Sequence, residues 1–146
     1  MAKRSAAHEQ AARDVWRLLF DTFMLTYPER QSALAAHGLT PNDSRALYSL
    51  DRRQGQAIGG LAKRWGCDPS TATWVVDRLE RAGMAERQPS PVDRRVKLVL
   101  LTGKGEKTIA ALNAAFDVPP PALEALSAAD LATLKALLGK LAPPRR

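Results

Sequence analysis

Residues 60–101 read GLAKRWGCDPSTATWVVDRLERAGMAERQPSPVDRRVKLVLL. Two segments with helical spacing meet in this stretch at Gly66-Cys67-Asp68, and a strand, a basic turn and a second strand follow directly. Glycine commonly ends a helix, whereas aspartate followed by proline commonly begins one, so a tight turn between two helices is expected here. The order helix, turn, helix, strand, turn, strand is that of a winged helix-turn-helix.

The second helix of this stretch is predicted from Pro69 to about Ala82. Spacings of three and four between apolar residues are typical of the buried face of an amphipathic helix. In this helix the apolar residues with that spacing are Ala72, Val75, Val76 and Leu79. One face is therefore expected to pack against a core, and the other face is available for recognition.

The sequence before residue 60 predicts three further elements. An amphipathic helix is expected from about Glu9 to Tyr27, with a large apolar stripe formed by Val15, Trp16, Leu19, Phe20, Phe23, Met24 and Tyr27. Pro28 predicts a kink or a restart of that helix, because proline cannot donate a backbone hydrogen bond. Thr40-Pro41 starts another helix, expected to end near Asp51, and Ala57-Ile58 can add an edge strand to the later hairpin.

The C-terminal part begins with two predicted strands, residues 84–88 and 96–101, which the connection 89–95 joins. Thr102 then caps a helix that the proline run Pro119-Pro120-Pro121 ends. A last helix begins after Ser127 and carries a leucine stripe along one side, formed by Leu131, Leu134, Leu137, Leu138 and Leu141. The fold class expected is mainly α with a small β-hairpin.

Composition and charge narrow the class of function. The chain has 146 residues, 45% of them hydrophobic, which suits one globular domain. Its formal net charge is +7, so it is expected to be attracted to polyanions such as nucleic acid. Nine Lys or Arg against five Asp or Glu lie in residues 60–105, so more than half of the net charge falls in that part of the chain.

Several other classes are disfavoured by the residues that the chain lacks. Cys67 is the only cysteine, which excludes an internal disulfide and a cysteine-cluster metal site and fits a reducing compartment. Residues 5–14 carry charges where a signal peptide needs an apolar run, and no stretch has the roughly 20 apolar residues of a membrane span. His8 and His37 lie near no nucleophile motif, phosphate loop or carboxylate pair. We expect a cytoplasmic protein with no membrane partner, no catalytic residues, no metal and no cofactor.

Two groups of residues are candidates for contact with double-stranded DNA. On the second helix, the residues predicted to face the major groove are Ser70, Thr71, Thr73, Trp74 and Arg78. At the tip of the hairpin, Arg94 and Arg95 are candidates for the minor groove, and Asp93 is expected to orient one of them. An alternative stays open, in which Ser70 and Thr71 only stabilise the first turn of the helix and the charged turn is merely solvated.

The run from Trp65 to Gly105 resembles the DNA-binding core of the MarR family of bacterial transcriptional regulators. The matching motifs are Asp93-Arg94-Arg95, Leu101-Thr102 with Lys104-Gly105, and Asp77-Arg78-Leu79-Glu80 with Gly83. The order of the outer helices extends the similarity over nearly the whole chain. One departure is Trp74, because many relatives have a basic or small polar residue there, so the resemblance does not carry over a base preference.

The resemblance implies a single MarR-like domain over residues 1–146. Helices in residues 9–38 and 106–142 would form a dimerisation region, and residues 40–105 the winged helix-turn-helix. A homodimer of this kind presents two winged modules to a pseudo-palindromic operator. The function implied is a sequence-specific regulator, specifically a repressor that a small-molecule ligand releases.

The resemblance also implies a crevice for a small aromatic effector, with candidate lining residues Trp16, Phe20, Phe23, Met24 and Tyr48. Aromatic residues at helical spacing are more often plain core, so both interpretations stay open. Two other functions are alternatives. One is a winged-helix module that contacts protein instead of DNA. The other is a redox-responsive regulator that uses Cys67, which lies beside a predicted helix N-terminus.

Overall fold

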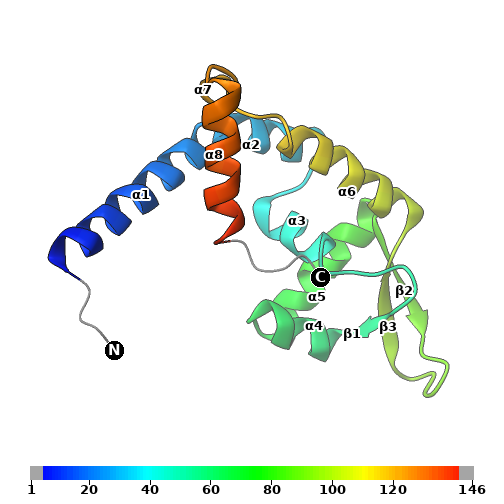
Figure 1. Ribbon diagram of the computed structural model, residues 1–146. Helices are drawn as coiled ribbons and strands as arrows, with labels where there is room; N and C mark the ends of the chain where they lie inside the picture. The colour runs from blue at the N-terminus through cyan, green and yellow to red at the C-terminus, as the bar shows by residue number, and fades with distance from the viewer. Residues whose placement is uncertain (1–4, 142–146) are drawn as a thin grey trace. The chain divides into compact units, whose positions relative to one another are not determined.

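A computed structural model of the protein describes residues 5–141 (Figure 1). Its elements are α1 (Ala6–Met24), α2 (Tyr27–Ala36), α3 (Pro41–Leu47), β1 (Gln56–Ala57), α4 (Ile58–Trp65), α5 (Pro69–Arg81), β2 (Ala85–Pro89), β3 (Lys97–Leu101), α6 (Gly103–Phe116), α7 (Pro121–Glu124) and α8 (Ala128–Gly139). The mainly helical fold with a small sheet is confirmed. The predicted range 106–142 extends one residue past the described part of the chain.

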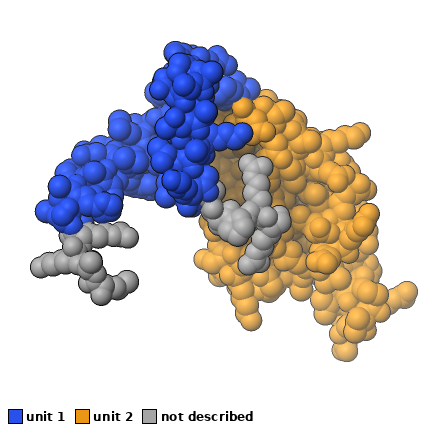
Figure 2. Space-filling view, in the orientation of Figure 1, with its two compact units in different colours: residues 1–27, 118–146 blue, residues 28–117 orange. Residues whose placement is uncertain are grey.

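The chain forms two compact units (Figure 2). Unit 1 consists of residues 1–27 and 118–146, and unit 2 of residues 28–117. Unit 2 therefore holds the whole winged helix-turn-helix. It also holds α6 and all of α2 except Tyr27, and the sequence assigned both helices to the dimerisation region.

The start of α3 follows from local chemistry. Gly38 has a φ of +66°, a left-handed conformation that suits glycine at a helix end. Thr40 then caps α3 in a capping box: its hydroxyl oxygen accepts a hydrogen bond from the backbone N–H of Asp43, whose carboxylate accepts one from the N–H of Thr40. This start matches the sequence-based prediction.

The end of α3 differs from the prediction. The helix ends at Leu47 and does not reach Asp51. The Asp51 carboxylate accepts hydrogen bonds from the backbone N–H groups of Arg53 and Gln54, at 2.6 and 2.8 Å. An aspartate that bonds the backbone two and three residues ahead favours a turn over a helix, so Asp51 begins the loop that leads to β1.

The turn between α4 and α5 forms as the sequence predicts. Gly66 has a φ of +69° and ends α4 in the left-handed conformation. The carboxylate of Asp68 accepts a hydrogen bond from the backbone N–H of Thr71, and Pro69 is the first residue of α5. The helix begins and ends within one residue of its expected bounds.

The three strands form one antiparallel sheet with the order β1-β3-β2. Val99 lies at its centre, opposite Arg87 on β2 and Gln56 on β1. The edge strand β1 is displaced by one residue from Ala57-Ile58, because α4 begins at Ile58. A β-carbon added to Gly105, in the first turn of α6, would lie 2.3 Å from the carbonyl oxygen of Met84, so this close approach of α6 to the start of the hairpin requires glycine.

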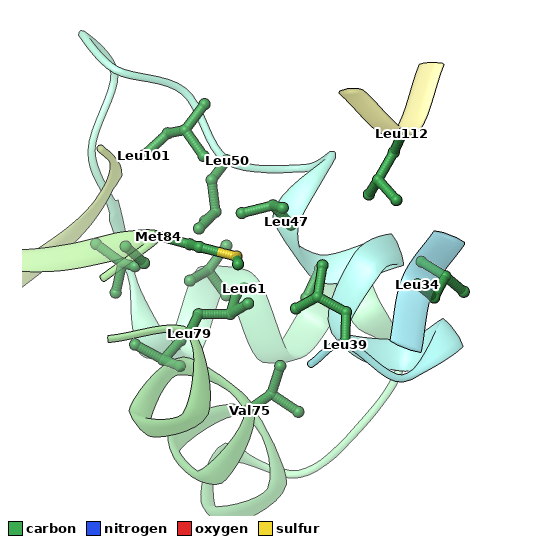
Figure 3. Packing of buried hydrophobic residues seen from close by; sticks show 14 residues of the cluster. Leu34, Leu39, Leu47, Leu50, Leu61, Val75, Leu79, Met84, Leu101 and Leu112 are labelled. Atoms are coloured by element: carbon green, nitrogen blue, oxygen red, sulfur yellow. The ribbon is translucent and has the colours of Figure 1, made fainter. Parts of the chain in front are cut away.

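Unit 2 has one hydrophobic core, which joins the helices to the sheet (Figure 3). All four apolar residues predicted for the inner face of α5 are buried. They share the core with residues from α3, α4, β3 and α6, which include Leu47, Leu61, Val99 and Leu112. The core therefore fixes which face of α5 points outward.

Unit 1 is different, because no described residue of α1, α7 or α8 is buried. Trp16 on α1 is 70% exposed. The exposed large apolar side chains of α8 are Leu131, Leu137 and Leu138. The short helix α7 was not predicted from the sequence, which indicated only a break at the proline run. No helix in the described chain is long and apolar enough to cross a membrane.

Candidate nucleic-acid interface

The first two turns of α5 hold three of the predicted major-groove residues in ordered positions. Ser70 and Thr71 are exposed, and their hydroxyl groups both donate hydrogen bonds to the Asp68 carboxylate. The half-buried Thr73 donates its hydroxyl to the carbonyl of Pro69, at 2.8 Å. Because each hydroxyl already donates its proton to an oxygen of the protein, its own oxygen can only accept hydrogen bonds from a ligand.

The bonds at Asp68 also fix its charge. The hydroxyl of Ser70, followed by the backbone N–H and hydroxyl of Thr71, holds the pKa of the Asp68 carboxyl well below its ordinary value. Asp68 is therefore ionised at neutral pH at the N-terminus of α5, where a negative charge is favourable for the helix.

Trp74 is the most prominent side chain on the outer face of α5. It is 55% exposed. The guanidinium carbon of Arg78, one helical turn later, lies 4.9 Å from the centroid of the indole ring, a distance typical of a cation–π contact. One side of the ring is therefore covered by Arg78.

Arg78 itself has a partner inside the protein. Its Nε and one terminal nitrogen donate to the two carboxylate oxygens of Asp43, at 3.1 and 2.7 Å. Asp43 is 1% exposed. Burial raises the pKa of the Asp43 carboxyl, but the hydrogen bonds from Arg78 and Thr40 outweigh burial, and its pKa lies below the ordinary value. The sequence predicted that Arg78 contacts DNA and did not anticipate this ion pair.

The wing, residues 90–96, carries the predicted minor-groove residues at its tip. Arg94 is exposed, and the side chain of Arg95 is 93% exposed. Asp93 accepts hydrogen bonds from the backbone N–H and the Nε of Arg95, at 3.0 and 3.4 Å. Of the two arginines, the structure pairs Asp93 with Arg95. Figure 1 shows the tip of the hairpin extending away from the helices of unit 2.

The role of Ser90 in the wing was missed from the sequence. The buried Ser90 accepts hydrogen bonds from the backbone N–H groups of Val92 and Asp93, which orders the turn. As a result Val92, an apolar residue, is 94% exposed. The prolines that precede Val92 predict an exposed connection, and the exposure of this valine agrees with them.

Strand β2 of the hairpin is also tied to α5 by an ion-pair cluster that the sequence did not reveal. Arg87 on β2 bridges the carboxylates of Asp77 and Glu80 on α5, and its nitrogen lies 2.8 Å from the Asp77 oxygen. The one sequence signal for this cluster is that Asp77 and Glu80 are three residues apart, which places both carboxylates on the same side of the helix. These two ion pairs hold the hairpin against α5.

The predicted effector residues fall in both units. Trp16, Phe20, Phe23 and Met24 lie on α1 in unit 1 and are exposed. Tyr48 lies in unit 2, where its hydroxyl donates to the Asn113 side chain at 2.7 Å. Burial, with the charge of Asp117, raises the pKa of Tyr48. An effector site over these five residues stays a prediction.

Cys67 is half-buried and lines a different, small cavity in unit 2. Its volume is about 120 Å³, and the other lining residues are Asn42, Arg45, Ala46, Trp65, Thr71 and Val75. Among residues 5–141 no group of three or more His, Cys, Asp or Glu side chains is arranged to hold a metal ion.

Comparisons with known proteins agree with this geometry. The model of the MarR family matches residues 39–97. The HTH-type transcriptional repressor MdtR of Bacillus subtilis is 30% identical over 98 residues, which cover 67% of this chain and 63% of MdtR. The crystal structure of the YusO protein from Bacillus subtilis superimposes with a TM-score of 0.72 and 26% identity, over 97% of this chain and all of YusO. Residues 39–97 therefore form a MarR-family domain.

The family assignment confirms the resemblance carried by residues 65–105. Another similar solved structure, a mutant of S. aureus MepR bound to an oligodeoxyribonucleotide, has a TM-score of 0.67 and 25% identity, over 86% of this chain and 94% of that one. The chain spans between 46% and 63% of the length of the curated relatives it matches. The MarR family match covers α3 through the start of β3, and so includes every predicted DNA-contacting residue.

Proposed function

We propose that this protein, which contains a MarR-family domain, is a sequence-specific, double-stranded DNA-binding transcriptional regulator. The observation that carries the proposal is the division of α5: its apolar face is buried in the core of unit 2, while Ser70, Thr71 and Trp74 are exposed. An α-helix fits the major groove of B-DNA, and an arginine-tipped hairpin beside it suits the narrower minor groove. The solved complex of a MepR mutant with an oligodeoxyribonucleotide supports DNA as the partner.

The protein acts as a homodimer in this proposal, with a second copy of the chain covering unit 1. The exposed apolar side chains of α1 include Trp16, Leu18 and Phe20, each more than half exposed. Apolar surface of this extent, gathered on a few helices, marks an interaction site. A two-fold dimer places two winged modules on one duplex, which predicts an operator with two inverted half-sites.

Repression with release by a small molecule is the proposed mode of regulation. MdtR is a named repressor, which supports the first part. A bound dimer excludes other proteins from the promoter DNA that it covers. Release requires an effector that binds the free form of the dimer better than the DNA-bound form. The exposed aromatic residues of α1 are the proposed contacts for the effector. A role at DNA accords with the cytoplasmic location expected from the sequence.

The decisive experiment selects bound duplexes from a random pool with purified protein at fixed salt. The proposal predicts an enriched sequence with two inverted half-sites about 10 bp apart, or a multiple of that distance. A pool without any enriched sequence contradicts sequence-specific binding. Enrichment of a single half-site contradicts the dimer.

A further inference from the structure

Trp74 differs in chemistry from the residues around it on the outer face of α5. Ser70 and Thr71 present hydroxyl oxygens that have already donated their protons to Asp68, so they are acceptors toward a base. In the major groove, hydroxyl acceptors suit the amino groups of adenine and cytosine. The indole ring of Trp74 is mainly an apolar surface, and the apolar group that a base displays in that groove is the C5 methyl of thymine.

A chain of contacts that begins in α3 holds Trp74 in place. The guanidinium of Arg78 lies over the ring, and the Asp43 carboxylate accepts two hydrogen bonds from it. Asp43 is in turn fixed by the backbone N–H and the hydroxyl of Thr40, both at 2.8 Å. The fork of a guanidinium on a carboxylate sets both the position and the plane of the group, so the plane under the indole is fixed as well.

This support has a consequence for recognition. A large side chain that is ordered before binding loses little conformational entropy when it meets its target. Two nitrogens of Arg78 bond Asp43 while its guanidinium carbon lies 4.9 Å from the centroid of the Trp74 ring, so Arg78 is placed to order that ring.

We infer that Trp74, held in place by Arg78 and Asp43, reads the methyl group of a thymine in each half-site. The inference rests on the proposed DNA-binding function and specifies what one residue of that site recognises. In it Trp74 is the contacting residue, and Arg78 and Asp43 are positioning residues.

Replacement of thymine by deoxyuridine tests the contact, because it removes the methyl group and leaves base pairing intact. The probe is the duplex enriched from the random pool, with each thymine replaced in turn. Wild-type protein is expected to bind about 3- to 5-fold more weakly when one particular thymine of a half-site is replaced, the factor for one buried methyl group. The Trp74→Ala variant is expected to bind the two duplexes equally.

Two results overturn the contact. One is wild-type binding that no deoxyuridine substitution changes. The other is a Trp74→Ala variant that discriminates as strongly as wild type. Both are distinct from a failure of the proposed function, in which wild-type protein selects no duplex at all.

The positioning role is tested with Arg78→Lys, which keeps the positive charge but cannot form the pair of hydrogen bonds with the Asp43 carboxylate. The ratio of affinities for the thymine and deoxyuridine duplexes is expected to fall toward 1, while binding to non-specific DNA at the same salt stays within about 2-fold of wild type. The matched control is Arg81→Lys, an exposed arginine in the same last turn of α5, which should keep the wild-type ratio.

A spectroscopic readout separates positioning from a general loss of fold. In a background with Trp16→Phe and Trp65→Phe, Trp74 is the only tryptophan. Arg78→Lys is expected to lower the fluorescence anisotropy of Trp74 and to increase its quenching by acrylamide, with the far-ultraviolet circular dichroism unchanged. A variant that keeps the wild-type anisotropy and the wild-type thymine preference contradicts the role of Arg78 and Asp43.

Discussion

Units 1 and 2 both contain helices with apolar residues at regular helical spacing, yet only unit 2 buries them. Val76 and Leu79 on α5 are fully buried, whereas Trp16 and Leu18 on α1 are about two-thirds exposed. Spacing alone shows that a helix has an apolar face, but not what covers that face. Unit 2 therefore supplies its own core, whereas the apolar faces of the described helices of unit 1 are left exposed, and the proposed dimer would cover them with a second copy.

The largest effect expected concerns the exposed face of unit 1. A charge at Leu137, in the variant Leu137→Glu, should separate the dimer, because the carboxylate would be buried without a partner. Loss of the second half-site contact should weaken binding to the selected duplex by about 10²- to 10⁴-fold. Sedimentation and fluorescence anisotropy measure the two effects. Lys135→Glu, on the same helix, is the control and should leave the dimer intact. A Leu137→Glu protein that stays dimeric and keeps wild-type affinity would show that α8 does not lie in the interface.

A pair of matched leucine variants compares the two units directly. Leu79→Ala leaves a cavity in the core of unit 2 and should lower the free energy of unfolding by about 2 to 5 kcal/mol at every protein concentration. Leu18→Ala on α1 should act only through the dimer, so its effect should vanish in dilute protein. Urea unfolding at several concentrations distinguishes the two. A concentration-independent loss for Leu18→Ala would mean that unit 1 has a core of its own.

Within unit 2, the wing should matter for binding and not for folding. Arg94→Ala is expected to weaken specific binding by about 1 to 3 kcal/mol and to reduce the salt dependence by about one phosphate contact. Arg52→Ala, which removes an exposed arginine bonded to Glu106, is the control. Equal affinities for wild type and Arg94→Ala at matched salt would refute the wing assignment.

The smallest effect expected is a pH dependence of the stability of unit 2. Because the pKa of Asp43 is lower in the folded protein than its ordinary value of 3.8, its contribution is fully present above that pH. It is lost as the pH falls through the lowered pKa. The difference in unfolding free energy between wild type and Asp43→Asn should therefore shrink below pH 3.8. A constant difference down to acid pH would show that ionisation of Asp43 does not stabilise the fold.

The sequence predicted those parts of unit 2 that local chemistry determines. Asp68, Pro69 and Gly83 set the bounds of α5, and its apolar spacing identified the buried face. The exposure of Ser70 and Thr71 follows from the same periodicity. Family resemblance then connected this local pattern to a known architecture.

The parts that the sequence did not predict depend on contacts between distant residues or on turns. Asp43 precedes Arg78 by 35 positions, so no local pattern reveals their ion pair or its effect on Trp74. The bridge from Arg87 to α5 requires knowledge of where the hairpin lies. The early end of α3 follows from hydrogen bonds of Asp51 to the loop, which helical spacing does not register.

The number of chains on one selected duplex tests the central claim most directly. Sedimentation equilibrium of the wild-type protein, free and bound to that duplex, gives the mass of each species. Dimeric free protein and two chains on each duplex are the results predicted for a unit 1 that a second copy covers and a unit 2 that contacts DNA. A monomer that binds one chain per duplex with undiminished affinity would contradict it.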